Sequence, residues 1–363
     1  MDSCGEGLQP FLPYVPSDLV SRRALERILS VAQQLPAALG AGPFGLECPL
    51  DGAPVADFSV AVLASRGDPA DLSRLGRADS VRPPGDGPGW ERIRRFASAW
   101  ADAASPLHRA VEEVWLEFDV GSARQAAALT PSVFFDPGHP GPRDPAPPRR
   151  PEELVRIAGA ALGILQGGRP SPGTLSALAE FVRVLPATAR VRFLGAMIPR
   201  ATTAVRVVVA GMSLGDVLTC LRRPGSRGTT DGLARIAPIA DLADRMWLAV
   251  DVDETGVAER LGLDCYCGSG APPAGDGGWP RLLQALVEAG VCTSAKRDAL
   301  LGATELSSRV LEAAAWPESL RRVSRLLGPG AFDRLELDVH HVKVVLGPGA
   351  RLQAKGYLRA GYR

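Results

Sequence analysis

The sequence lacks an excess of charge of one sign, long apolar runs and clustered cysteines, and each absence excludes a class of protein. Its 41 lysines and arginines against 40 aspartates and glutamates leave a formal net charge of +1, which argues against a chain-wide attraction to nucleic acid or to an anionic membrane. It has no run of about 20 apolar residues that could span a bilayer. Residues 1–16 have neither the basic nor the apolar region of a secretory signal. We therefore expect a cytoplasmic protein with no nucleic-acid partner and no membrane partner.

Cysteine and histidine are too few and too scattered to predict a metal centre. Among six cysteines, Cys265 and Cys267 lie two apart in a strand-like run, but no second pair or His-x-His cluster lies near them. We expect reduced thiols that fill space in a strand, with metal ligation as the alternative. His340 and His341 are adjacent, and because neighbouring strand residues point to opposite faces we expect their rings on opposite sides of a sheet. No cofactor is expected to be required.

The apolar residues that are present follow two periods, one helical and one alternating. The expected helices cover Ser17–Gln34, Trp90–Glu112, Pro151–Gln166, Pro172–Val184, Ser213–Arg222, Asp231–Arg245, Trp279–Ala289, Ser294–Leu301 and Glu318–Leu327. The expected strands cover Leu46–Cys48, Asp57–Ala64, Val114–Val120, Ser132–Asp136, Ala189–Ile198, Ala204–Gly211, Met246–Val252, Leu261–Cys267 and two more from about Leu335 to the end. The order helix, strand, strand, helix recurs along the chain.

Two of the expected strands also repeat each other in their letters. VWLEFDV at Val114–Val120 and MWLAVDV at Met246–Val252 share Trp, Leu, Asp and Val at matched places. Each precedes a second strand that ends in a glycine, Gly138 or Gly268. We interpret the chain as five helix-strand-strand-helix units with ten antiparallel strands.

A proline-rich tract interrupts this order. Seven prolines lie in residues 137–151, a density that suits neither a helix nor a central strand. We expect an exposed excursion from a single domain that spans residues 1–363. The alternative is a chain of two α+β domains that divide near this tract.

The C-terminal stretch His340–Arg363 contains no acidic residue and predicts a β-hairpin around a Gly347-Pro348-Gly349 turn. If its alternate apolar residues face a core, the polar residues of both strands share the opposite face. That face would carry His341, Lys343, Lys355, Tyr357 and Arg359.

A sheet of ten antiparallel strands with helices between its hairpins can cover its outer face with those helices and close on itself, which removes exposed edges. The polar residues of each strand then line a lumen. On this rule the inward residues are Trp115, Glu117, Asp119, Arg190, Arg192, Arg206, Trp247, Asp251, Asp264 and Tyr266, with the polar residues of the C-terminal hairpin. So many polar and aromatic residues would fill a small core badly but would line a ligand cavity well.

The segments LEFDV at Leu116–Val120, HVKVVL at His341–Leu346 and AKGYL at Ala354–Leu358, in this strand order, resemble the αββα-barrel (ABBA) aromatic prenyltransferases. The resemblance covers most of the chain as topology, although the chain does not carry every Lys/Tyr pair of the best-known members. It implies a closed ten-stranded antiparallel barrel surrounded by helices, in the α+β class. It also implies a prenyltransferase of natural product biosynthesis that moves a prenyl group from a prenyl diphosphate to an electron-rich aromatic small molecule or peptide side chain.

That chemistry assigns roles to the inward residues. Cations that stabilise the departing diphosphate would be Arg192, Arg206, Lys343, Lys355 and Arg359, with Tyr357 beside them. Rings that shield an allylic cation from water would be Trp115, Trp247 and Tyr266. Glu117 would be the general base, because the matched repeat position holds Ala249 and the strand itself does not need a carboxylate. Asp119 and Asp251 are possible ligands of a Mg²⁺ that accompanies the diphosphate.

Each role has a plainer alternative. The cations could be surface charges on a half-exposed sheet, the tryptophans could serve packing alone, and Glu117 could be a buried ion-pair partner. Asp119 and Asp251 could be structural residues at strand ends. The alternative function is a barrel that binds a peptide or a small metabolite without prenylating it, which an interior dominated by neutralising ion pairs would favour.

Overall fold

The computed structural model describes residues 3–75, 87–121, 130–138, 149–200, 202–222, 232–268, 278–305, 309–310 and 334–362. Its strands are β1 (Phe44–Pro49), β2 (Asp57–Leu63), β3 (Glu113–Phe118), β4 (Ser132–Phe135), β5 (Arg190–Ala196), β6 (Val205–Ala210), β7 (Arg245–Asp253), β8 (Gly256–Tyr266), β9 (Arg309–Val310), β10 (Arg334–Leu346) and β11 (Leu352–Tyr362). Its α-helices are α1 (Cys4–Leu8), α2 (Arg22–Ala32), α3 (Asp68–Arg74), α4 (Pro88–Ala101), α5 (Pro106–Ala110), α6 (Pro151–Leu165), α7 (Pro172–Arg183), α8 (Leu214–Leu221), α9 (Leu233–Ala240), α10 (Gly278–Glu288) and α11 (Ser294–Glu305).

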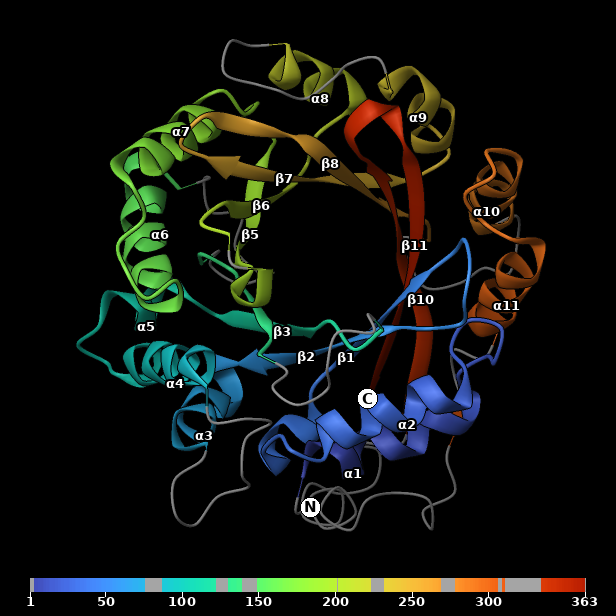
Figure 1. Cartoon of the computed structure of the whole chain (residues 1–363), viewed down its shortest axis with the longest axis horizontal. Helices are drawn as coiled ribbons and strands as arrows, with labels where there is room; N and C mark the ends of the chain where they lie inside the picture. Colours follow the sequence, from blue (N-terminus) through green and yellow to red (C-terminus); the bar gives the residue numbers. More distant parts are fainter. Residues whose placement is uncertain are drawn as a thin grey trace.

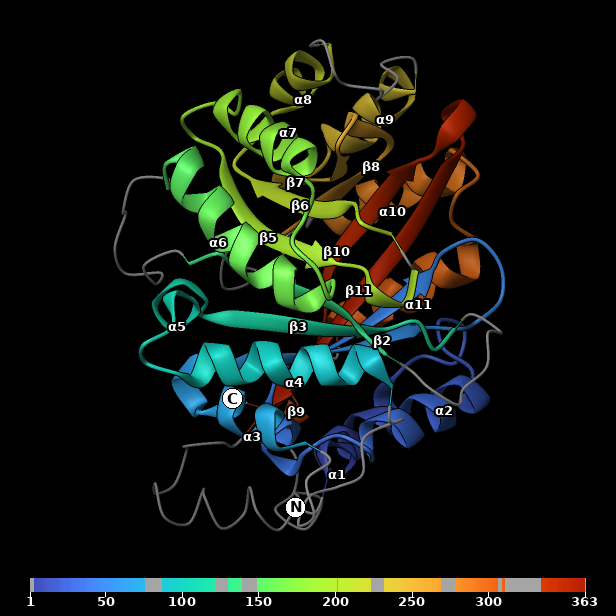
Figure 2. The ribbon, with the colours of Figure 1, turned by 60° about the vertical axis from the view of Figure 1, so that its left-hand side comes forward.

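Ten of these strands form a closed antiparallel barrel. Successive strands from β1 to β8 pair with each other, β8 pairs with β10, β10 pairs with β11, and β11 returns to β1. The short β9 pairs with β10 outside this ring. Figure 1 looks into the ring of strands and shows the helices around its outside, and Figure 2 shows the same arrangement from another side. The predicted ten-stranded barrel of five helix-flanked hairpins is confirmed.

The alternation in the sequence decides which face of each strand meets the helices. In β3, Val114, Leu116 and Phe118 are fully buried, whereas the residues between them are half-buried. Phe118 packs outward on Trp90 of α4, with ring centres 6.2 Å apart, and continues a row of stacked rings on neighbouring strands. The apolar core therefore fills the layer between barrel and helices and leaves the polar faces of the strands for the interior.

Several element boundaries differ from the predicted ones. The first long helix begins at Arg22 rather than at Ser17, because the Ser21 side chain caps it. The helix expected over Trp90–Glu112 is two helices, since Ser105 caps a new one at Pro106. The helix expected over Asp231–Arg245 ends at Ala240, and Arg245 already begins β7.

Two expectations fall on parts of the chain that the structure does not describe. The helix expected over Glu318–Leu327 lies outside the described residues, as do residues 139–148 of the proline-rich tract. The strands on either side of that tract, β4 and β5, pair with each other, so both halves of the chain share one sheet. Among the described helices none is long and apolar enough to cross a membrane.

The N-terminal helices are fastened to the last barrel strand through Gly7. The Tyr362 hydroxyl at the end of β11 donates a 2.6 Å hydrogen bond to the Gly7 carbonyl. A Cβ on Gly7 would lie 1.9 Å from the Gly40 carbonyl oxygen. Gly7 therefore allows the close approach of two backbone segments.

We expect Gly7→Ala to lower the free energy of unfolding by about 1–3 kcal/mol, because the backbone of one segment must move to admit the methyl group. Gly168→Ala is the matched control, since a Cβ there would meet nothing within 4 Å. Urea denaturation of both variants measures the difference. Equal stability of the two variants would contradict the close packing at Gly7.

Candidate functional site

The interior of the barrel contains a cavity of about 410 Å³. Residues from each of the ten barrel strands line it. A cavity of this size lies in the range of small-molecule sites, which is roughly 300–1,000 Å³.

Each predicted diphosphate, base and shielding residue lines this one cavity, namely Trp115, Glu117, Arg192, Arg206, Trp247, Tyr266, Lys343, Lys355, Tyr357 and Arg359. Asp119, Asp251 and Arg190 do not line it. Asp119 and Asp251 lie beside arginines, and Arg190 lines a separate hollow near α6 and α7. The geometry brings the predicted residues together, while the roles proposed for them stay predictions.

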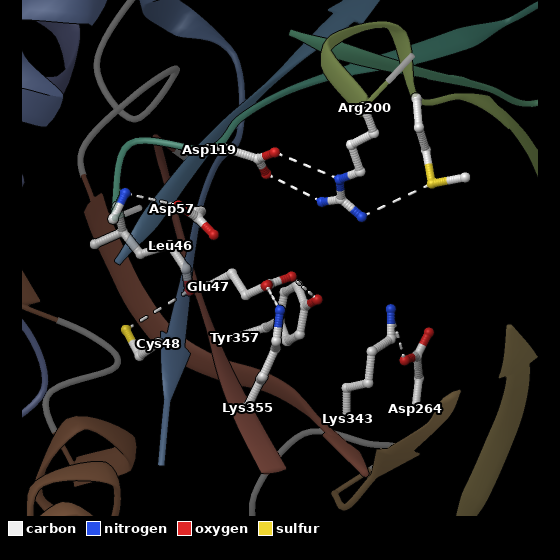
Figure 3. A network of polar contacts seen from close by, with 12 residues as sticks. Leu46, Glu47, Cys48, Asp57, Asp119, Arg200, Asp264, Lys343, Lys355 and Tyr357 are labelled. Carbon is white, nitrogen blue, oxygen red and sulfur yellow. Dashed lines mark hydrogen bonds and ion pairs between the residues drawn. The ribbon is translucent and has the colours of Figure 1, made fainter. Parts of the chain in front are cut away.

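Glu47 of β1 contacts two polar residues of the neighbouring strand β11, Tyr357 directly opposite it and Lys355 two residues away (Figure 3). Its carboxylate forms an ion pair with Lys355 and accepts a hydrogen bond from the Tyr357 hydroxyl. Burial alone would raise the pKa of Glu47, but the ammonium groups of Lys355 and Lys343 outweigh burial and hold the pKa at about 2. Glu47 is therefore ionised and neutralises part of the predicted anion site.

Lys343 has a similar partner on the neighbouring strand. Its Nζ lies 3.2 Å from Asp264 Oδ1 (Figure 3), and it also lies over the Tyr357 ring at 5.3 Å from the ring centre. Burial raises the pKa of Asp264, and the Lys343 ammonium counteracts part of that rise. The pair places a lysine between a carboxylate and a phenol in the middle of the lumen.

Glu117 of β3 differs from the other interior carboxylates. Among the described residues it has no hydrogen-bond or ion-pair partner, although Arg200, Arg206 and Lys343 are near enough to act on its charge. Burial and the negative charge of Glu47 raise the pKa of Glu117 to about 7, and the three cations lower it by less. The side chain is thus poised to exchange a proton near neutral pH.

Three arginines gather where the β5–β6 and β7–β8 hairpins turn. Arg206 donates to both carboxylate oxygens of Asp251, at 2.5 and 2.9 Å, and Arg200 donates to Asp119 at 3.1 Å. Arg260 has no ion-pair partner within the described part of the chain. Burial lowers the pKa of Arg260, and so do the neighbouring Arg206 and Arg200. This arginine group, Arg200, Arg206 and Arg260, contains three guanidinium groups, two of which form ion pairs with carboxylates.

Arg192 is clamped between carboxylates near the opposite end of the lumen. It pairs with Asp136 and, at 3.0 Å, with Glu113, whose other oxygen accepts a 2.8 Å hydrogen bond from the Trp115 indole. Burial raises the pKa of Asp136 to about 6 despite Arg192. Arg192 therefore orients Trp115 through Glu113, which contacts both side chains. Arg359 forms a separate ion pair with Asp338 at 3.1 Å.

The expectation that His340 and His341 face opposite sides of the sheet is wrong. Between Val339 and His341 the register of β10 against β11 shifts by one residue, which is a β-bulge at His340. Both imidazoles consequently line the cavity. The His341 ring stacks on Tyr357 at 4.0 Å, and Tyr266 lies between the two histidines and Trp247.

The cysteines and carboxylates form no metal site in the described part of the chain, where no group of three or more His, Cys, Asp or Glu is placed to hold an ion. Cys265 and Cys267 are buried free thiols, and burial raises the pKa of each. Asp119 and Asp251 are each engaged by an arginine, so a Mg²⁺ ligand role would require these contacts to open.

Sequence reasoning did not single out Glu47, Arg200 or Arg260, which shape the site as much as the predicted residues do. Glu47 could have been found, because it alternates between the apolar Leu46 and Cys48. Arg260 was missed because β8, which begins at Gly256, was expected to begin only at Leu261. Arg200 lies in a turn, the 3-10 helix η4 (Ile198–Arg200), where strand alternation gives no signal.

No known protein family matches the sequence when it is compared with family models. No curated protein matches it either. Among solved structures the chain is similar to the crystal structure of AnaPT from Neosartorya fischeri, with a TM-score of 0.43 and 13% sequence identity over 99% of this chain and 91% of that chain.

The raised pKa of Glu117 predicts how stability depends on pH. Between an unfolded pKa of about 4.5 and a folded pKa of about 7, the native state holds a proton that the unfolded state releases, so this group's contribution falls as pH rises. Glu117→Gln removes the titrating carboxyl and therefore this loss of stability at higher pH. We expect the variant to gain stability relative to the wild type between about pH 5 and pH 8.

Thermal unfolding of wild type, Glu117→Gln and the exposed control Glu112→Gln across this pH range measures the effect. The control should change with pH as the wild type does. A difference between Glu117→Gln and wild type that stays constant with pH would show that Glu117 titrates as an ordinary carboxyl.

Proposed function

We propose that this protein is a transferase that moves a prenyl group from a prenyl diphosphate to an electron-rich aromatic small molecule or peptide side chain inside the barrel. The observation that carries the proposal is the placement of Glu117, whose carboxyl has no partner among the described residues and faces the same cavity as the arginine group. The arginine group would hold the departing anion, and Glu117 in the same cavity would receive the proton.

The arginine group supports binding of the diphosphate. Arg260 has no ion-pair partner among the described residues. Burial and its neighbours Arg206 and Arg200 lower its pKa, and the charges of Asp251 and Glu47 offset only part of this. A diphosphate would relieve that repulsion and could be gripped by planar guanidinium forks. Lys343 and Lys355, each already paired with a carboxylate, would add point charges toward the middle of the lumen.

The transfer step balances with these groups alone. The allylic C–O bond breaks and its electron pair leaves with the diphosphate, whose charge the cations stabilise. A ring carbon of the acceptor forms the new bond to the allylic carbon and then loses its proton to Glu117. With a pKa of about 7, Glu117 is both ionised in part and basic enough near neutral pH.

The aromatic residues would keep water from the allylic cation. Trp247 lies 4.9 Å from Tyr266, and Tyr266 lies 5.1 Å from His341, which stacks on Tyr357. With Trp115 from the other side of the barrel, these rings give the lumen a wall with π faces, which attract a cation.

The second candidate is a barrel that binds a peptide or small metabolite without prenyl transfer. The ion pairs of Lys343, Lys355, Arg206 and Arg359 favour it, because these cations already have protein counter-charges. An uncharged ligand would leave those pairs intact, whereas a diphosphate competes with them. Binding of diphosphate therefore separates the two candidates.

Incubation with dimethylallyl, geranyl and farnesyl diphosphates and a panel of indole, phenol and peptide acceptors tests the transferase. We expect prenylated product, and Glu117→Gln should lower turnover by roughly 100-fold or more with little change in diphosphate affinity, as for loss of a general base. Absence of both turnover and diphosphate binding across the panel would overturn the proposal.

Diphosphate affinity tests the cation assignment. Arg260→Gln should weaken binding of geranyl thiolodiphosphate, measured by calorimetry, by roughly 10-fold or more, and Lys343→Ala and Lys355→Ala should weaken it as well. Arg22→Gln, which removes an exposed charge on α2, is the control and should leave the affinity unchanged. Unchanged affinity in all three lumen variants would show that these cations do not bind the diphosphate.

A further inference from the structure

The bulge in β10 gives the cavity a pair of histidines that the transfer step does not use. His340 is the inserted residue, and it and His341 stand together opposite Tyr357 of β11. A regular strand would have turned one ring into the layer of helices. Bulges commonly re-aim a side chain beside a functional site, and this one aims a second imidazole into the lumen.

The two imidazoles fix each other's protons. Their Nδ1 atoms are 2.8 Å apart, a hydrogen-bond distance that admits one proton between two nitrogens. Burial lowers the pKa of both rings, to about 3 for His340 and well below the usual value for His341, so both rings are neutral. One ring must therefore donate from Nδ1 and keep a free lone pair on Nε2, and the other must carry its proton on Nε2.

The position of Asp264 indicates which of the two rings donates from Nδ1 and which accepts. Its Oδ1 lies 3.9 Å from His341 Nε2 and 3.2 Å from the Lys343 ammonium. The 3.9 Å distance is too long for a hydrogen bond, but the negative charge of the Asp264 carboxylate favours a proton on the nearby His341 Nε2 over a lone pair. His341 then accepts at Nδ1, His340 donates from Nδ1, and the free lone pair is on His340 Nε2.

The surroundings of His340 are those of a binding site for a flat ring. Its imidazole meets the Tyr266 ring edge to face at 5.4 Å, and Tyr266 in turn packs on Trp247 at 4.9 Å. These three side chains all line the cavity and come from neighbouring strands. Burial lowers the pKa of His340, and Arg359 and Arg245 lower it further, while the Asp264 carboxylate offsets only part of this, so the ring stays neutral and His340 Nε2 unprotonated.

We propose that His340 Nε2 accepts a hydrogen bond from the acceptor substrate, an aromatic ring that carries an N–H or O–H group, and holds that ring beside Trp247 and Tyr266. The proposal rests on the prenyl-transfer function above, and it narrows the acceptor to indole-like and phenol-like rings. His341 and Asp264 are positioning residues, because they set the tautomer of His340 without contacting the ring.

Nitrogen NMR of the full chain with ¹⁵N-labelled histidine tests the tautomers without any substrate. The chain has four histidines, and His108, whose Nδ1 lies 3.0 Å from the Trp100 carbonyl, provides an internal standard protonated at Nδ1. We expect His340 protonated at Nδ1 and His341 protonated at Nε2. A proton on His340 Nε2, or a charged imidazole at neutral pH, would overturn the proposal.

Affinities for indole and 1-methylindole test the contact itself, measured by NMR titration of the protein with geranyl thiolodiphosphate bound. The wild type should bind indole roughly 3- to 10-fold more tightly than its N-methyl analogue, the value of one hydrogen bond. His340→Phe should abolish the preference, and His340→Gln, whose amide oxygen can accept, should restore part of it. His341→Asn should keep the preference, since its amide oxygen can still accept from His340 Nδ1.

The failure of this inference is distinct from failure of the transferase. Bound thiolodiphosphate with no preference for indole in the wild type, or a preference that survives in His340→Phe, would overturn the role of His340 and leave prenyl transfer standing. Loss of thiolodiphosphate binding in the wild type would instead remove the transferase on which the inference rests.

Discussion

Closure of the sheet is the constraint on which the rest of the structure depends. Once β11 pairs with both β10 and β1, no strand edge remains among the ten, and their polar faces are forced into one enclosed space. Charges removed from water in this way need partners, because an unpaired buried ion is costly. The interior is consequently a set of ion pairs that join neighbouring strands, such as Lys355 with Glu47 and Arg206 with Asp251.

Two lumen residues that do not take part in these ion pairs support the proposed prenyl transfer. Within the described residues Arg260 is a lumen cation without a carboxylate partner and Glu117 is a lumen carboxylate without a cation in contact. An apolar pair would stabilise the barrel as well or better, so stability alone does not account for leaving opposite charges unpaired in one cavity. A ligand that delivers an anion to one and a proton to the other accounts for both.

The sequence predicted the barrel because its signal is alternation, which repeats on every strand and needs only the printed letters. It missed the lumen residues His340, Phe193 and Arg260, which lie at breaks in the alternation, although Arg192 beside one such break was predicted. The register shifts place His340 beside His341, Arg192 beside Phe193 and Arg260 across from Asp251, and all of these except Asp251 line the cavity. A bulge depends on the strand paired alongside, so no local pattern marks it. The pairing of Glu47 with Lys355 could not be predicted either, because the two residues lie near opposite ends of the chain.

The proposed transferase must hold a prenyl diphosphate in the lumen against its arginines. A crystal structure of the complex with geranyl thiolodiphosphate tests it most directly. We expect phosphate oxygens within hydrogen-bond distance of Arg206 and Arg260, with the allylic carbon in the same cavity as Glu117. Phosphates bound outside the barrel, or a lumen that stays without ligand at saturating concentration, would contradict it.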